Sequence, residues 1–343
     1  MSTASSSITT NVSSNSDLTA ILEPVASDIA AAEELLETNL IDDNPFVADL
    51  LAQVFQAGGK RIRTGITLLA SRATQPVQTE FSRLHIVLAV LTETIHTASL
   101  VHDDVIDGAA VRRGKQTVNR KWNDRLAVLL GDLLFAQASI CLARIMNPVI
   151  VGIYGQVLGD LCAGEIRQMR SQYSCEVDWD AYIRKSVCKT ASLFAAGSHS
   201  GAILNGCSDD VVTALKEYGM NLGICFQIVD DLLDVTSNTE KLGKPAGSDL
   251  QGGLVTAPAL SVLERNDGPA LRLKELIRSR GIATEEGTNE ALEIIRANGG
   301  VEATIAVCQK YAQSSKQQLL KLRPSRFRDS LEGLVDYVLT RTS

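Results

Sequence analysis

The sequence predicts an all-α protein. Hydrophobic residues make up 45% of its 343 residues, but aromatic residues make up only 4%, whereas β-strands are enriched in aromatic and β-branched residues. The eight prolines leave the whole span between Pro148 and Pro245 free of proline, which suits a series of uninterrupted helices. Alanine and leucine, both strong helix formers, are abundant. The length is compatible with one large domain or two.

The N-terminal region divides into a tail and a helical domain. Residues 1–16 are mostly Ser and Thr without a charged side chain, which predicts a disordered tail followed by one helical domain over residues 17–343. Acidic and apolar residues alternate at helical spacing over residues 17–42, as in an outer amphipathic helix. Residues 46–56 continue that pattern up to Gly58-Gly59, a stop signal.

The remaining elements follow as long apolar segments. Residues 81–107, 126–146, 149–170 and 179–205 are expected to be core helices, and residues 257–343 are expected to form amphipathic helices. Residues 126–146 come nearest to a membrane span, but Asp132 and Arg144 interrupt them. A buried core helix is therefore expected there, and no transmembrane segment.

Two aspartate clusters stand inside apolar segments. The first lies in VHDDVIDGAAVRRG (101–114), and FQIVDDLLDV (226–235) repeats its spacing. On a helix these carboxylates share one face and repel each other, so a cation is expected to compensate them. Carboxylates that leave room for water and phosphate oxygens suit Mg²⁺. One such cluster alone fits a solvated helix face, whereas two in apolar surroundings favour a functional site. The clusters are Asp103, Asp104 and Asp107, and Asp230, Asp231 and Asp234.

Cationic residues accompany both clusters. Arg112 and Arg113 follow the first cluster and can clamp phosphate oxygens. GGKRIR, residues 58–63, brings the first basic residues of the chain behind two glycines. A Gly/Lys loop with Lys244 follows the second cluster. Each basic motif alone is typical of a charged helix cap, but beside metal ligands they predict a diphosphate site.

Three further polar positions are less distinctive. His96 lies two helical turns before Asp103 on nearly the same face, although a lone histidine in an apolar helix is usually a core residue. Lys189-Thr190 precedes an Ala-rich stretch and has no meaning in isolation. Glu165 and Gln168, spaced i,i+3, fit either a buried polar network or a solvated edge.

Charge and motif content exclude several functions. A net charge of −7 without a broad basic face disfavours nucleic acid as a partner. Seven cysteines without a CxxC pair fit free buried thiols in a reducing compartment, and four histidines lack zinc-ligand spacing. No Ser-His-Asp arrangement, Rossmann glycine motif or Walker loop is present. No basic residue precedes Lys60, so neither a secretory signal nor an Arg-rich transit peptide is recognisable.

Taken together, GGKRIR, HTASLVHDDVIDGAAVRRG, KTASL, FQIVDDLLD and GKPAGSDL resemble the trans-polyprenyl diphosphate synthases. The five motifs stand in the family's order and spacing from Gly58 to Leu250, and they are most similar to those of long-chain, solanesyl-type members from cyanobacteria and plastids. The resemblance implies the isoprenoid synthase fold, a single helical bundle around a central prenyl-chain cavity, normally as a homodimer. The location implied is the cytoplasm, or the plastid if the source is eukaryotic.

The resemblance also implies roles for individual residues. Mg²⁺ would bind Asp103, Asp107 and Asp230, together with Asp104, Asp231 and Asp234, and would neutralise the allylic diphosphate as it leaves. The departing diphosphate would take the proton, so no side-chain base is required. Isopentenyl diphosphate would bind Lys60, Arg63, His96 and Arg113, and the allylic diphosphate would bind Arg112, Lys189, Thr190, Gln227 and Lys244.

Small residues on the helix before the first cluster bear on the length of the product. Ala98 and Ser99 lie about one turn before Asp103, where short-chain relatives carry a bulky aromatic residue, so a long product that supplies quinone side chains is expected. Ile95 and Leu91 are alternative positions for the residues that close the far end of the prenyl-chain cavity.

Two positions depart from the family pattern. Thr64 stands where a proline commonly follows the GKRxR motif, and Leu254 stands where many relatives carry a lysine.

Four other functions account for these motifs to different degrees. A geranylgeranyl diphosphate synthase would share every motif. A non-catalytic regulatory subunit usually lacks aspartates in one cluster, whereas both clusters are complete here. A type I terpene cyclase would carry a different second metal motif and no GGKRIR. A helical scaffold protein would need none of the five motifs.

Overall fold

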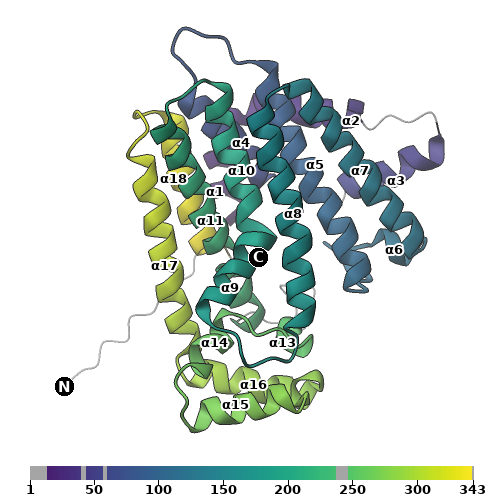
Figure 1. Cartoon of the computed structure of the whole chain (residues 1–343), viewed down its shortest axis with the longest axis vertical. Helices are drawn as coiled ribbons and strands as arrows, with labels where there is room; N and C mark the ends of the chain where they lie inside the picture. Colours follow the sequence, from purple (N-terminus) through teal and green to yellow (C-terminus); the bar gives the residue numbers. More distant parts are fainter. Residues whose placement is uncertain (1–13, 40–43, 57–59, 237–245, 342–343) are drawn as a thin grey trace.

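The computed structural model describes residues 14–39, 44–56, 60–236 and 246–341. Long helices run side by side along the long axis of the molecule, and the shorter α15 and α16 lie at one end (Figure 1). The N-terminal half contains α1 Ser14–Leu22, α2 Ala26–Asn39, α3 Pro45–Gln56, α4 Ile62–Thr74, α5 Arg83–Ile106, α6 Val118–Lys121, α7 Asp124–Ile145 and α8 Pro148–Arg170.

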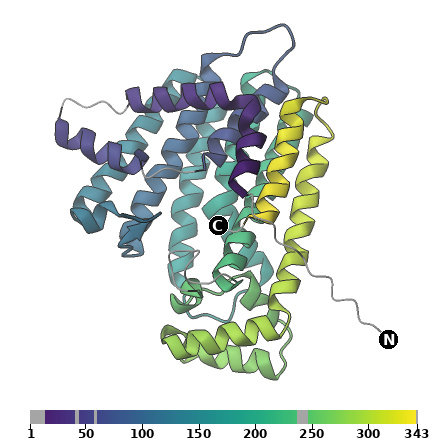
Figure 2. The ribbon, with the colours of Figure 1, turned by 180° about the vertical axis from the view of Figure 1, so that it is seen from behind.

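The C-terminal half continues the bundle. Its helices are α9 Trp179–Ser186, α10 Ser192–Leu204, α11 Asp209–Thr236, α13 Ser248–Gln251, α14 Ala257–Leu263, α15 Gly268–Arg278, α16 Glu285–Ala297, α17 Gly300–Leu319 and α18 Arg326–Thr340. A π-helical turn, η2 Val187–Ala191, joins α9 to α10, and short 3₁₀ turns are η1 Glu23–Val25 and η3 Gly281–Ala283. Seen from behind, α1 lies beside α18 (Figure 2).

Side-chain caps explain where several helices begin. Ser82 accepts a hydrogen bond from the Leu84 amide at the start of α5, and Asn123 and Asn147 cap α7 and α8 in the same way. Pro24 falls within the predicted helix over residues 17–42, and the chain divides there into α1, η1 and α2. α1 begins at Ser14, so the last three residues of the predicted tail are helical; residues 1–13 lie outside the described part.

The all-α prediction is confirmed, and the described residues add one short two-stranded hairpin to the helices. β1 Val111–Arg112 pairs antiparallel with β2 Lys115–Gln116 directly after the first aspartate cluster. Arg113 and Gly114 between them have φ values of 51° and 77°, as the tight turn of a two-residue hairpin requires. This turn fixes Arg112 and Arg113 beside the end of α5.

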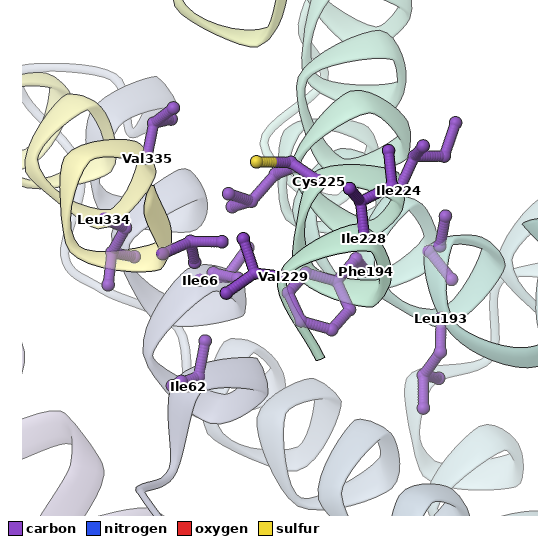
Figure 3. Close-up of a cluster of buried hydrophobic side chains, with 14 of the residues drawn as sticks. Ile62, Ile66, Leu193, Phe194, Ile224, Cys225, Ile228, Val229, Leu334 and Val335 are labelled. Atoms are coloured by element: carbon purple, nitrogen blue, oxygen red, sulfur yellow. The ribbon is translucent and has the colours of Figure 1, made fainter. Parts of the chain in front are cut away.

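The main core lies between α4, α10, α11 and α18. Figure 3 shows its apolar side chains meeting, with Ile66 from α4, Phe194 from α10, Ile228 from α11 and Leu334 from α18. Gly223 allows a close approach between backbones, because a Cβ there would lie 2.4 Å from the Ala191 Cα. α11, the helix that carries the second aspartate cluster, therefore packs directly against η2.

A smaller core lies between α3, α5, α6 and α7. It contains Ala98 and Val101 of α5 with Leu130 and Leu134 of α7. α7 is not the buried core helix that the sequence predicts, since Leu129 on its outer side is 62% exposed. The apolar pattern of residues 126–146 extends around the helix, whereas neighbouring helices cover only one side.

Three helices are long and apolar enough to cross a membrane by length and composition: α5, α7 and α8. Their most apolar windows have mean hydropathies of 1.5, 2.0 and 1.4. Other helices cover most of this window in α5, while most of it is open in α7 and α8. The absence of a transmembrane segment therefore stays a prediction.

Candidate active site

In the first aspartate cluster, an arginine binds one carboxylate, whereas the other two have no hydrogen-bond partner among the described residues. Asp104 is buried, and its carboxylate accepts a hydrogen bond from Arg112 Nε at 2.7 Å. Its backbone carbonyl accepts another from the Asn119 side chain. Asp103, in the last turn of α5, and Asp107, which follows it, have no hydrogen-bond or salt-bridge partner for their carboxylates among the described residues. Asp104 thus anchors the hairpin, while the other two carboxylates remain available.

The electrostatic environment of Asp103 favours a bound cation. Burial raises its pKa to about 6, and the negative charges of Glu165 and Asp107 act in the same direction. Lys189 and Arg112 oppose that rise but do not cancel it. A divalent ion would stabilise the charged form of this carboxylate against burial.

Asp231 of the second cluster is buried and held by protein groups. Its carboxylate accepts hydrogen bonds from Tyr182 Oη at 2.7 Å, Gln227 Nε2 at 3.0 Å and the Ala257 amide at 3.3 Å. Gln227 Oε1 in turn accepts a hydrogen bond from Thr190 Oγ1 at 2.8 Å. This chain of hydrogen bonds fixes the orientation of Gln227 and joins α9, η2, α11 and α14.

Asp234 has a different protein role. Its carboxylate accepts hydrogen bonds from the Ser248 amide and hydroxyl and from the Asp249 amide, at 2.9–3.2 Å. These contacts cap α13, which begins beyond the predicted Gly/Lys loop. Burial and the nearby Asp249 raise the pKa of Asp234 to about 6. Lys244, the loop residue predicted to bind the allylic substrate, lies outside the described residues.

Asp230 contacts a residue that the sequence did not single out. Arg341, just after α18, donates from Nη2 to the Asp230 carboxylate and to the Phe226 carbonyl, both at 2.7 Å. Its guanidinium also lies over the Phe226 ring, 3.7 Å from the ring centroid. The Arg341 side chain is only 5% exposed, so a buried cation occupies one side of Asp230.

Lys189, in the π-helical turn η2, faces the first cluster and Asp249. Its Nζ lies 3.5 Å from Glu165 Oε2. Burial opposes its charge, but Glu165, Asp103, Asp107 and Asp249 outweigh burial and raise the Lys189 pKa. Gln168 Nε2 donates to Glu165 at 3.2 Å, so Glu165 and Gln168 form a polar network rather than a solvated edge. Single π-turns within helices frequently mark functional positions.

Arg63 and His96 form a half-buried pair. Arg63 Nη1 lies 3.0 Å from His96 Nε2. Because guanidinium groups only donate, His96 Nε2 must accept, which requires a neutral ring protonated at Nδ1. Burial and the charges of Arg63, Arg113 and other arginines hold the pKa of His96 well below its usual value. Burial also lowers the pKa of Arg63 to about 10, and its guanidinium lies over the Phe194 ring.

Glu93 binds two residues that lie close to Arg63 in the sequence. Its carboxylate accepts hydrogen bonds from Arg61 Nη1 at 3.1 Å and from Thr64 Oγ1 at 3.0 Å. Thr64 stands where the family pattern commonly has proline, and here its hydroxyl binds Glu93. In the sequence, Glu93 is noticeable as a charged residue inside the apolar run over residues 81–107. A cavity of about 60 Å³ adjoins it and is lined by residues including Arg61, Glu93, His96, Arg112 and Arg113.

The remaining site residues lie close to these groups. Lys60 Nζ lies over the Tyr337 ring, 5.8 Å from its centroid. Ser99 is partly exposed and shares the helical face of His96 and Asp103, whereas Ala98 is fully buried against α7. In the ranges that the structure describes, no three His, Cys, Asp or Glu side chains converge to hold one metal ion. An ion here would need ligands from water and substrate phosphates, as Mg²⁺ usually takes.

The neutral His96 gives a testable pH dependence. A histidine whose folded pKa is depressed contributes stability above its unfolded pKa, near 6.5, and that stability is lost as the pH falls. We expect His96→Gln to lose less stability than the wild type between pH 7.5 and 5, by at most about 2 kcal/mol. Urea unfolding at both pH values measures this difference, and equal losses would contradict a neutral His96 held by Arg63.

Comparisons with known proteins agree with this geometry. The polyprenyl synthetase family model matches residues 44–295. Solanesyl diphosphate synthase 1 of Arabidopsis thaliana chloroplasts is 42% identical, covering 94% of this chain and 79% of the relative. A prenyl transferase of Synechocystis is 43% identical, covering 94% and 98%. A polyprenyl synthase of Caulobacter crescentus, solved with calcium and isoprenyl diphosphate, has a TM-score of 0.88 at 31% identity, covering 97% and 100%. The chain belongs to the polyprenyl synthetase family and is a prenyltransferase with the isoprenoid synthase fold.

Proposed function

We propose that this protein is a long-chain all-trans polyprenyl diphosphate synthase of the solanesyl type, which adds isopentenyl diphosphate units to an allylic diphosphate. The observation that carries the proposal is the open carboxylate pair of Asp103 and Asp107 facing Lys189 beside the fixed Arg63–His96 pair. The similarity to solanesyl diphosphate synthases over nearly the whole chain supports the long product.

The allylic diphosphate would bind between the two clusters. Asp103, Asp107 and Asp230 would hold Mg²⁺, which would supply the positive charge that stabilises diphosphate as a leaving group. Lys189 would contribute a further positive charge, since its pKa is raised by the surrounding carboxylates. Thr190 and Gln227 are held to Asp231 by hydrogen bonds, so their positions are set before substrate arrives.

Isopentenyl diphosphate would bind the cationic side of the site. Arg63, His96, Arg113 and Lys60 would contact its phosphate oxygens, and Glu93 would hold Arg61 and Thr64 in place behind them. The neutral His96 would donate one hydrogen bond from Nδ1 without adding charge. The alkene of isopentenyl diphosphate would attack the allylic cation formed after ionisation. The departing diphosphate would accept the proton released. The lengthened product would then serve as the next allylic substrate.

Labelled isopentenyl diphosphate tests this reaction directly. We expect incorporation into an organic-soluble product with an allylic primer and Mg²⁺, no incorporation with EDTA, and recovery when Mg²⁺ is restored. Dimethylallyl, geranyl, farnesyl and geranylgeranyl diphosphates would serve as alternative primers. Failure of all four primers with Mg²⁺ present would contradict the proposal and favour a non-catalytic regulatory subunit.

The outer faces of α7 and α8 support a homodimer. α7 leaves Leu129 and Ile140 exposed, and α8 leaves Ile166 exposed. Exposed apolar surface of this extent is typical of an interaction face. Gly152, Gly155 and Gly159 lie along α8, and a Cβ at any of them would meet no atom within 4 Å. Glycine destabilises an exposed helix, so these positions favour close approach by a second copy of the chain.

The variant Gly155→Glu distinguishes this dimer from a monomer. In an isolated chain the new side chain would enter open space and improve helix propensity, so the folded state would be unaffected or slightly stabilised. In the proposed dimer it would place a charge in the apolar interface and shift the mass measured by light scattering from two chains towards one. Gln309→Glu, on the exposed face of α17, is the matched control. A wild type that elutes as one chain would contradict the proposal.

A further inference from the structure

Two cysteines from different helices meet in the core. Cys225 of α11 and Cys308 of α17 are 83 residues apart, yet their Sγ atoms are 3.0 Å from each other. Both are almost fully buried, with exposures of 0% and 1%. Within the described part of the chain this is the one cysteine pair whose sulfur atoms come within hydrogen-bond distance. The sequence shows no close cysteine spacing, so only the fold brings the pair together.

The packing around the pair holds the sulfur atoms in place. α11 and α17 pack along much of their length. Cys308 Sγ also lies 3.7 Å from the Cys225 carbonyl oxygen, and Figure 3 shows Cys225 beside the apolar side chains of Ile224 and Ile228. A disulfide requires the two sulfur atoms to stand about 2.0 Å apart. The two sulfur atoms would therefore have to approach each other by about 1 Å to form one.

We propose that Cys225 and Cys308 are a site of reversible oxidative cross-linking that joins α11 to α17. The oxidant would be a small disulfide such as oxidised glutathione. One thiolate attacks the reagent, forms a mixed disulfide and releases one molecule of thiol. The second thiolate then attacks the protein sulfur and releases the other thiol, so two protein thiols are oxidised and one reagent disulfide is reduced to two thiols.

Burial sets the rate of this reaction. The contact with Cys308 and burial raise the pKa of the Cys225 thiol, so little reactive thiolate is present. The reagent reaches the pair only when the two helices separate transiently. The cross-link consequently forms slowly in the folded protein, and reductants reverse it slowly because the same packing limits their access.

The cross-link would stabilise the helix that carries the second aspartate cluster. It would close a loop of 83 residues, and constraining a loop of that length restricts the unfolded chain strongly. We expect the melting temperature to rise by about 5 °C on oxidation. The cross-link does not depend on the proposed reaction, so its test stands apart from the activity assay.

Peptide mapping of the wild-type protein tests the proposal without any variant. The full-length protein would be incubated with oxidised glutathione, denatured, alkylated and digested without reductant. We expect a linked peptide pair containing Cys225 and Cys308, which dithiothreitol separates. The exposed Cys162 should instead carry glutathione, which shows that the reagent was active.

Variants and melting curves complete the test. Cys225→Ala and Cys308→Ala should each abolish the linked peptides and the rise in melting temperature, while Cys162→Ala should retain both. If Cys162 is modified while Cys225 and Cys308 remain free to alkylate, or each carries glutathione separately, the proposal is wrong. A linked pair without any change in melting temperature would overturn the stabilising role.

Discussion

Replacing Asp103 by asparagine is expected to lower turnover by about 10²–10³-fold, the size of effect seen when one group that stabilises developing charge is removed. The amide keeps the shape of the side chain but loses its negative charge. Because Asp103 has no hydrogen-bond or salt-bridge partner among the described residues, the substitution breaks no internal contact. The loss of this negative charge should therefore impair substrate and metal binding and leave the stability of the fold unchanged.

The measurement is initial-rate kinetics with saturating isopentenyl diphosphate and a titration of Mg²⁺, alongside a melting curve. Asp329→Asn is the matched control, since that carboxylate on α18 is 68% exposed and lies outside the site. Asp104→Asn provides a contrast, because it weakens the Arg112 contact and should reduce stability as well as rate. An Asp103→Asn enzyme with full activity would remove the first cluster from the mechanism.

Introducing phenylalanine at Ser99 or Ala98 is expected to shorten the product. Both residues precede the metal-binding end of α5 by about one turn. Ser99 is partly exposed on the face of His96 and Asp103, so a ring there would block the path of the growing chain. Ala98 is fully buried against Leu130 and Leu134, so Ala98→Phe should also cost about 1–3 kcal/mol through overpacking.

Chromatography of the dephosphorylated products measures this effect. Ser99→Phe should shift the product towards farnesyl or geranylgeranyl length with little loss of stability. Ala303→Phe adds the same ring to an exposed position of α17 and should leave product length unchanged. Folded Ser99 and Ala98 variants that still make the wild-type product would show that the chain does not pass this level of α5.

The sequence predicted the helices but not the separate roles of the aspartates. Asp107 and Asp234 hold the same position in the two clusters but differ in their contacts, because the partners of Asp234 lie beyond the loop that follows it. Two partners of Asp231 likewise come from other helices, α9 and α14. Such partners are distant in sequence and carry no spacing signal. Arg341 is the clearest example, since 111 residues separate it from Asp230.

Local patterns were reliable where local physics decides the structure. Hydrophobic periodicity located α5, α7 and α8 to within a few residues, because caps and prolines near their ends act locally. The burial of α7 could not be read in this way, because its apolar pattern continues onto the outer face that the other helices leave uncovered. The π-helical turn around Lys189 also left no sequence signal, because it depends on packing between η2 and α11.

The length of the product made by the wild-type enzyme tests the central claim most directly. Purified protein, Mg²⁺, labelled isopentenyl diphosphate and an allylic primer would be incubated to completion, and the dephosphorylated product would be sized against polyprenol standards. We expect a single dominant product of solanesyl length. A product that stops at geranylgeranyl length would keep the reaction but contradict a long-chain synthase.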